Sequence, residues 1–455
     1  MFVAIGIGTN DTWQVTFQIQ NSIITLVLSR IFSSDIPQEH RWNFIHLYFD
    51  IGWYGILAGS AVNFLNIYAT RLGANGFEIG LLSAMGAIVS LSLAIPAGHW
   101  VEARPIGKAV FWSSVIYRIG FLLWIPLPWL FGDSGQIWAL IILALFMAVP
   151  LTPLSVGFNA LFAAAVPLDY RAHVAGIRNV VLSITYMISS IGSGYLLNQL
   201  AFPLGYQIIF GIGFFGAAMS SLHLYLIKPI TGSEVKALQP EQRPAQNLER
   251  MTRHSNFLSA IRADIWQTPF RIILLALLAF HLTQNLPLPI FPLIQVNVLH
   301  LTDNQIGVGS AIFYFILLIG STQLRSMVQK IGHQKVTALG IMSMALYPIG
   351  MAISRTPLHY YITSAIGGLA SSLATGAYAN FLLEHIPAND RPAYLAWYNV
   401  ILNLCVLVGS LAGPLIANEI GLTMALFIFA AARIAAGIVI FKWGSPTARA
   451  QTVIT

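Results

Sequence analysis

Long apolar runs alternate with short polar segments over most of the chain, and their lengths predict membrane-spanning helices. A bilayer core of about 30 Å needs about 20 apolar residues per helix. The runs fall into two groups, one before a long hydrophilic segment and one after it. The predicted spans cover residues 44–69, 77–98, 109–131, 136–165, 174–199, 205–227, 270–297, 305–327, 334–353, 358–385, 392–417 and 421–442. The sequence therefore predicts an all-α membrane protein with twelve transmembrane helices.

The hydrophilic segment divides these spans into two six-helix bundles. The residues before the first span contain the apolar run Ile23–Leu28, which is too short to cross a bilayer. We expect that part of the chain to be a cytoplasmic or interfacial arm rather than a thirteenth span. The predicted organisation is an N-terminal arm (1–43), a first bundle (44–228), a cytoplasmic central loop (229–268), a second bundle (269–443) and a cytoplasmic tail (444–455).

The composition agrees with a lipid environment. Hydrophobic residues make up 56% of the chain and charged residues 9%, whereas a soluble domain has about a quarter charged residues. So few charges cannot cover a water-facing surface. The net charge of +7 does not indicate nucleic acid, because the basic residues are spread over short loops. The single cysteine, Cys405, excludes an internal disulfide framework.

The distribution of lysine and arginine predicts the orientation in the membrane, since basic residues collect in cytoplasmic loops. Most of the 23 basic residues fall on or beside the side that holds both termini, the central segment and the loops after even-numbered spans. Arg71 and Arg355 fall on the opposite side, and Arg118 and Arg433 fall inside spans. We therefore expect a multi-pass protein of the plasma (inner) membrane with both termini in the cytoplasm.

The two halves of the chain repeat each other. Val166–Arg171 is echoed 220 positions later by Ile386–Arg391, with proline and arginine in register. Glu78-Ile79-Gly80 recurs 227 positions later as Gln305-Ile306-Gly307. Two parallel six-helix repeats joined by a polar loop are typical of secondary transporters.

The loops after spans two and eight carry related motifs. They contain Gly98, Glu102, Arg104 and Lys108 in the first copy, and Lys330 and Gly332 in the second. In degenerate form these residues resemble the G-x-x-x-D-R-x-G signature, with trailing basic residues, of the major facilitator superfamily. The resemblance covers residues 44–443. It implies two pseudo-symmetric six-helix bundles that rock about a central site and move a small-molecule substrate by alternating access.

We expect the motif residues to form a cytoplasmic gate together with two further arginines. Gly98 would let neighbouring helices approach closely, and Glu102 would pair with Arg104 to hold the outward-facing state. The alternative is that the basic loop residues only fix the topology. Arg171 and Arg391 occupy equivalent positions after the repeated prolines, where helix entry and membrane anchoring are favoured over gating.

The resemblance also implies that spans 1, 4, 7 and 10 line the substrate cavity. Polar side chains in these spans are costly in lipid unless they face the protein interior. The expected cavity residues are Tyr48, Trp53, Tyr54, Asn63, Asn159, His281, Gln284, Asn285, Tyr378 and Asn380. Their aromatic and amide character favours export of an amphipathic or neutral solute, while uptake of a sugar-like solute stays open.

Span 7 has the most unusual sequence of the twelve. Its segment 287–292 contains three prolines, which makes an unbroken helix improbable. His281, Gln284 and Asn285 share one face at i, i+3 and i+4. We expect this face to reach the cavity, the alternative being a hydrogen-bonded cluster between helices.

Asp50 is the acid that lies well inside a span, about 9 Å from its predicted cytoplasmic end. Burial favours the protonated form of a carboxyl group, so Asp50 is the expected proton-coupling residue. The alternative is an acid that is paired with a loop base or hydrated. Arg118 and Arg433 lie deeper, on spans 3 and 12, where structural pairing with carbonyl groups is favoured over substrate binding.

Several chemistries lack the residues that they need. A P-loop lysine motif, metal-ligand spacing and paired carboxylates do not occur in the sequence, so we expect no cofactor, no metal and no enzymatic activity. The predicted function is secondary transport by a monomer in the lipid bilayer, with protons as the candidate coupling ion. A non-transporting receptor or a pigment or lipid assembly factor on the same fold is the alternative.

Overall fold

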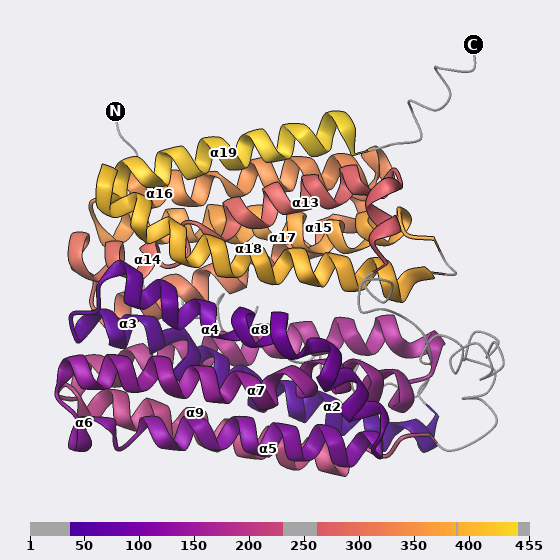
Figure 1. The fold of residues 1–455 in the computed structure, drawn as a ribbon. Coiled ribbons are helices and arrows are strands. Elements are labelled where there is room, and N and C mark those ends of the chain that lie inside the picture. The colour runs from indigo at the N-terminus through magenta and orange to yellow at the C-terminus, as the bar shows by residue number, and fades with distance from the viewer. Residues whose placement is uncertain (1–36, 231–261, 388–389, 445–455) are drawn as a thin grey trace, which may run out of the picture.

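The computed structural model describes residues 37–230, 262–387 and 390–444, which form helices in two stacked halves (Figure 1). The first half contains α2 (Gln38–Leu57), the π-helix η1 (Ala58–Val62), α3 (Asn63–Arg71), α4 (Gly76–Glu102), α5 (Ile106–Trp124), α6 (Leu127–Leu130), α7 (Asp133–Ala165), α8 (Leu168–Gln199) and α9 (Leu204–Leu226). The second half contains the 3-10 helix η2 (Ala263–Gln267), α13 (Phe270–Asn285), α14 (Ile290–Leu293), the π-helix η3 (Ile294–Val298), α15 (Asp303–Met344), α16 (Leu346–Ile353), α17 (Pro357–Glu384), α18 (Arg391–Ile420) and α19 (Leu422–Trp443).

Each predicted span falls on one or more of these helical segments. Within the described part of the chain, nine segments are long and apolar enough to cross a membrane. One of them, Asp303–Ile353, holds two predicted spans, because the backbone leaves helical geometry at Gly332, where φ is 80°. The first span (α2, η1 and α3) and α17 complete the set of twelve.

The largest difference from the expected boundaries lies at the first span. α2 begins at Gln38, six residues before the predicted start at residue 44. Asp50 is therefore about 18 Å along the helix from its first residue, twice the expected depth. The expected arm, central loop and tail otherwise fall mainly on residues 1–36, 231–261 and 445–455, outside the described residues.

The repeated Glu78-Ile79-Gly80 and Gln305-Ile306-Gly307 motifs begin equivalent helices in the same way. Asn75 accepts a hydrogen bond from the Glu78 backbone N–H at 3.0 Å, while the Glu78 carboxylate accepts one from the Asn75 N–H at 2.9 Å. Thr302 and Gln305 form the same reciprocal capping box at the start of α15. A capping box satisfies two backbone donors at a helix start, so this part of the repeat encodes two helix N-termini.

The glycines of the same motifs bring the two halves into contact. A Cβ added to Gly80 on α4 would overlap the carbonyl oxygen of Ser410 on α18. A Cβ added to Gly307 on α15 would overlap the carbonyl oxygen of Ser190 on α8. These are equivalent pairs, since Gly307 follows Gly80 by 227 positions and Ser410 follows Ser190 by 220. Two related helix crossings, α4 on α18 and α15 on α8, therefore join the halves.

The first helix of each half is broken near its middle. In the first half the π-helix η1 interrupts the span between α2 and α3. In the second half α13 ends at Asn285, and the chain resumes helical structure at Ile290, after Pro287 and Pro289. The predicted break of span 7 is thus confirmed, and its equivalent in span 1 forms without proline.

Candidate substrate cavity

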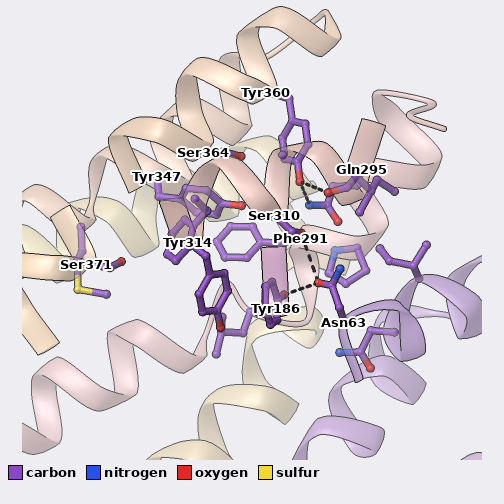
Figure 2. A pocket seen from close by; sticks show the side chains of 18 of the residues that line it. Asn63, Tyr186, Phe291, Gln295, Ser310, Tyr314, Tyr347, Tyr360, Ser364 and Ser371 are labelled. Carbon is purple, nitrogen blue, oxygen red and sulfur yellow. Dashed lines mark hydrogen bonds between the residues drawn. The ribbon is translucent and has the colours of Figure 1, made fainter. Parts of the chain in front are cut away.

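A cavity of about 320 Å³ lies between the two halves. That volume lies at the small end of the range for ligand pockets, about 300–1,000 Å³. It is lined by Asn63, Asn66, Ile67, Tyr186, Gln284, Leu288, Phe291, Pro292, Gln295, Ile306, Gly309, Ser310, Phe313, Tyr314, Met344, Tyr347, Tyr360, Ser364, Ser371 and Arg433. Most of these residues belong to the second half, and Figure 2 shows their side chains converging on one space.

Asn63 is the polar centre of the wall that the first half provides (Figure 2). Its side-chain oxygen accepts hydrogen bonds from the Tyr186 hydroxyl at 2.8 Å and the Ser310 hydroxyl at 3.3 Å. Its amide nitrogen donates to the Ser190 hydroxyl at 3.1 Å. Ser190 in turn donates to the Gly307 carbonyl at 3.0 Å. The network connects α3, α8 and α15, so its hydrogen bonds depend on the relative position of the two halves.

A second polar pair lies in the wall that the second half provides. The Gln295 amide donates to the Tyr360 hydroxyl at 3.2 Å (Figure 2). In the first half the Tyr68 hydroxyl donates to the Gln136 side-chain oxygen. Gln295 follows Tyr68 by 227 positions, so the two halves use the same contact with the residue types exchanged. In the second half the contact borders the cavity.

Aromatic rings supply the apolar part of the lining. Tyr186 and Tyr314 stack across the two halves with ring centroids 3.8 Å apart. Tyr347 packs edge-on against Phe291, with centroids 4.9 Å apart, and against Phe313 at 5.9 Å. Flat ring faces beside amides and hydroxyls suit a solute that has both a ring or apolar surface and hydrogen-bonding groups.

Two of the predicted cavity residues, Asn63 and Gln284, line this space. Tyr48 is buried in an apolar cluster of the first half, and Trp53 packs edge-on against Phe215. The other predicted cavity residues lie outside the lining: Tyr48, Trp53, Tyr54, Asn159, His281, Asn285, Tyr378 and Asn380. Tyr54, Asn159 and Asn380 are exposed instead.

The polar face predicted on span 7 divides between the cavity and the protein interior. Gln284 lines the cavity. The His281 ring lies 3.1 Å from the Tyr398 hydroxyl on α18, and its ring also contacts that of Tyr378. Asn285 donates to the His281 carbonyl at 2.8 Å. The expected cavity role therefore fits Gln284, whereas the alternative of an interhelical cluster describes the other two residues.

Asp50 lies in a buried ion pair inside the first half. Its carboxylate is 3.2 Å from the Arg178 guanidinium, which also donates to the Leu47 carbonyl at 2.8 Å. The Ser220 hydroxyl donates to the other carboxylate oxygen of Asp50. The guanidinium lies over the Phe158 ring, 4.7 Å from its centroid. The partner of Asp50 is thus a residue inside the bundle rather than a loop base.

The repeat gives this ion pair a counterpart in the second half. Tyr398 follows Arg178 by 220 positions, and its partner His281 lies on span 7 as Asp50 lies on span 1. The same two helices of each half therefore meet through a buried polar pair. The charges are confined to the first half, where Arg178 and Asp50 are 8% and 4% exposed.

An ion pair joins the two halves where α3 ends and α15 begins. Arg71 at the end of α3 lies 3.0 Å from the carboxylate of Asp303 at the start of α15, and it donates to the Leu301 carbonyl at 2.7 Å. The Tyr206 hydroxyl donates to the same Asp303 oxygen at 2.9 Å. Arg71 is one of the two basic residues on the side where the charge pattern disfavours them. The unusual position of Arg71 was therefore the sequence signal that could have identified its ion pair with Asp303.

The expected gate residues lie at the opposite end of the halves. Arg104 donates to the Trp100 carbonyl at 2.9 Å and covers its ring, and within the described residues no ion pair joins it to Glu102. A Cβ on Gly98 would meet nothing within 4 Å, so the expected close helix approach at Gly98 is not present. Gly332 provides the positive φ that separates spans eight and nine.

The other arginines and lysines expected at the gate form no hydrogen bond or ion pair between the halves among the described residues. Arg171 donates to the carbonyls of Val166 and Ala163 at 3.1 Å and 2.7 Å, where it caps the end of α7. This contact agrees with its favoured role in helix entry. Lys108, Lys330 and Arg391 are exposed. Among the described residues, the hydrogen bonds between the halves lie between the cavity and the end that holds Arg71 and Asp303.

Two repeated six-helix halves around a central polar cavity define a membrane protein with the fold of secondary transporters. The chain belongs to the Major Facilitator Superfamily, whose sequence profile matches residues 49–296 and 273–453. This is a family of transporters, not of enzymes. No curated protein is significantly similar to the chain.

Solved transporter structures share this fold at low sequence identity. The nucleoside transporter NupG is 11% identical, with a TM-score of 0.64 over 88% of this chain and 98% of that one. The xylose transporter XylE from E. coli, in an inward-open conformation, is 13% identical with a TM-score of 0.65 over 88% and 95%. A POT family transporter in complex with a thioalcohol-conjugated peptide is 11% identical, with a TM-score of 0.65 over the same shares.

Proposed function

We propose that the protein is a secondary active transporter that moves a small polar organic solute across the plasma (inner) membrane by alternating access. The observation that carries this proposal is a cavity between two repeated halves. The described hydrogen bonds and ion pair between the halves lie between that cavity and one end. Arg71 and Asp303 pair across the halves at that end, whereas no hydrogen bond or ion pair among the described residues joins the halves through the gate residues. Rocking of the halves about the cavity would exchange the open and closed ends.

The orientation follows from the charge pattern of the loops. The end with Lys108, Lys330 and Arg391 carries the basic loops, which favour the cytoplasmic side. In that orientation the conformation is open to the cytoplasm, and both termini lie there.

The lining supports a solute that forms several hydrogen bonds and offers a ring or apolar face. Amides, phenols and serine hydroxyls alternate with aromatic rings around the cavity. Polar organic solutes are named for the similar structures, namely nucleosides, xylose and a peptide conjugate. Export of an amphipathic solute is our first expectation, because the lining combines aromatic rings with few charges.

Asn63 provides the test of the cavity. Asn63→Ala is expected to lower solute flux about tenfold, because it removes an amide and leaves Tyr186 and Ser310 without their acceptor. Flux is measured in proteoliposomes over a panel of sugars, amphipathic drugs and organic acids, with and without an imposed pH gradient. Asn159→Ala is the matched control, since Asn159 is an exposed amide outside the lining. Equal flux in both variants would contradict the assigned cavity.

Asp50 is the proposed proton-coupling residue. The Arg178 guanidinium competes with the proton for the Asp50 carboxylate. Protonation of Asp50 would release Arg178 and loosen the contact between α2 and α8. Asp50→Asn is therefore expected to abolish stimulation of flux by a pH gradient while counterflow continues. The measurement compares gradient-driven uptake with solute exchange in the same vesicles. If a pH gradient stimulated flux through Asp50→Asn as strongly as through the wild type, the coupling proposal would be wrong.

A non-transporting receptor is the second candidate function. It is motivated by the second loop motif, which keeps Lys330 and Gly332 but lacks the acid of the first copy. Solute binding without flux across the whole panel, in vesicles with either orientation of the gradient, would favour the receptor.

A further inference from the structure

Arg433 on α19 brings a positive charge to the cavity from a helix outside the spans expected to line it. The residue is 3% exposed and belongs to the cavity lining. Among the described lining residues it is the one charged side chain, and none is acidic. The electrostatic character of the cavity therefore depends on this guanidinium.

The protein satisfies the Arg433 guanidinium only in part. One terminal nitrogen donates to the Met344 carbonyl at 3.1 Å, and the other donates to the Thr283 carbonyl at 2.6 Å. Its Nε is buried and has no hydrogen-bond partner. In the described part of the chain, no carboxylate lies within ion-pair distance of it. A buried cation with neutral partners alone is costly, so an anion that reached it would be bound favourably.

The contrast with Arg178 sharpens this point. Arg178 is buried to a similar degree, but Asp50 neutralises it within the first half. Of the two buried arginines outside the lining, Arg178 has a carboxylate partner and Arg118 donates to the Ser221 hydroxyl. The arginine that lines the cavity has only carbonyl oxygens as partners.

We propose that Arg433 is the anion-recognition residue of the cavity and that the transported solute is a small organic acid. This inference rests on the proposed function. The carboxylate lies against the guanidinium, the aromatic rings of Tyr314 and Tyr347 cover the apolar part of the solute, and Asn63 and Tyr360 meet its hydroxyl or carbonyl groups. Organic cations are excluded, because no lining acid offsets the charge of Arg433.

The test compares carboxylates with their primary amides on the purified full-length protein. Matched pairs of aromatic, hydroxy and sugar acids serve as probes, 4-hydroxybenzoate and 4-hydroxybenzamide among them, and binding is followed by thermal stabilisation in detergent. The wild type is expected to bind the acid of a pair about tenfold more tightly than the amide, as for a charged hydrogen bond. Arg433→Gln is expected to remove that preference, while Arg433→Lys retains part of it.

Arg118→Gln is the matched control. Arg118 is likewise buried, donates to the Ser221 hydroxyl at 2.8 Å and has an unpartnered Nε, but it does not line the cavity. The Arg118→Gln variant should prefer the acid over the amide by the same factor as the wild type. The melting temperatures without probe identify any variant that fails to fold. If Arg433→Gln does not fold, the acid preference of Arg433→Lys is compared with that of the wild type instead.

The outcomes separate this inference from the proposed function. Equal binding of acids and amides, preference for amides, or an acid preference that survives Arg433→Gln overturns the inference and leaves the transporter in place if flux is observed. Acid binding that depends on Arg433, without flux in proteoliposomes, supports Arg433 as the anion-recognition residue and contradicts transport of the acid. No stabilisation by any member of the panel counts against the inference.

Discussion

Arg178→Leu is expected to destabilise the protein by about 3–5 kcal/mol, because it leaves the Asp50 carboxylate buried without a counter-ion. Asp50 is 4% exposed, and Arg178 supplies its one charged partner among the described residues. The same substitution also removes a donor from the Leu47 carbonyl. The measurement is thermal unfolding of the purified protein in detergent.

The double variant Asp50→Leu/Arg178→Leu distinguishes the loss of stability caused by an unpaired buried charge from the stability that the intact ion pair contributes. It is expected to recover most of the lost stability, since replacement of both buried charges by apolar groups is often neutral or stabilising. Arg104→Leu is the control, because Arg104 is exposed and its guanidinium donates to the Trp100 carbonyl on the same helix end. If Arg178→Leu melted at the wild-type temperature, or the double variant at a lower one than the single, the assigned ion pair would be wrong.

Gly307→Leu is expected to open the end of the cavity that Arg71 and Asp303 close. A side chain at Gly307 must displace the Ser190 backbone on α8, so the crossing of α15 and α8 cannot form as it stands. A shift of about 1–2 kcal/mol against the closed end changes the ratio of the two states roughly 5- to 30-fold. The outward-facing population should rise by a factor in that range.

The natural chain has a single cysteine, Cys405, which is buried, so accessibility can be read from one introduced thiol. Ser310→Cys in a Cys405→Ser background places the thiol in the cavity lining. A membrane-impermeant thiol reagent added from the extracellular side should label it faster when Gly307→Leu is present. Gly192→Leu on α8 is the control, because a Cβ there meets nothing within 4 Å. Equal labelling rates with and without Gly307→Leu would refute the role of the crossing.

The sequence was sufficient for features that depend on local signals. Apolar run length predicted the twelve spans, the prolines predicted the break in span 7, and the Glu78 and Gln305 motifs identified the repeat. Each of these follows from residues that are close together in the chain. The family match and the similar transporter structures confirm the fold class that they predicted.

The cavity lining depended on the rotation of each helix, which the sequence does not determine here. A helix that faces lipid on one side and protein on the other is apolar all round, so polarity alone does not tell which side is which. Asn159 and Asn63 are both amides within spans, yet one is exposed and the other is the centre of a hydrogen-bond network. The expectation that four spans line the cavity left out Tyr186 and Tyr314, and it favoured a structural role for Arg433, which lies in the lining.

The paired Gly–Ser crossings make the closed end resemble an isologous dimer interface, in which the same patch appears on both partners. Gly80 meets Ser410 as Gly307 meets Ser190, and Gly76 meets Pro414 as Asp303 meets Gly194. Opening this end is therefore comparable to the dissociation of a dimer whose two near-identical subunits share one chain. The contacts have diverged unequally, because Ser190 has joined the Asn63 network. The α15–α8 crossing is thus linked to the cavity lining through Asn63.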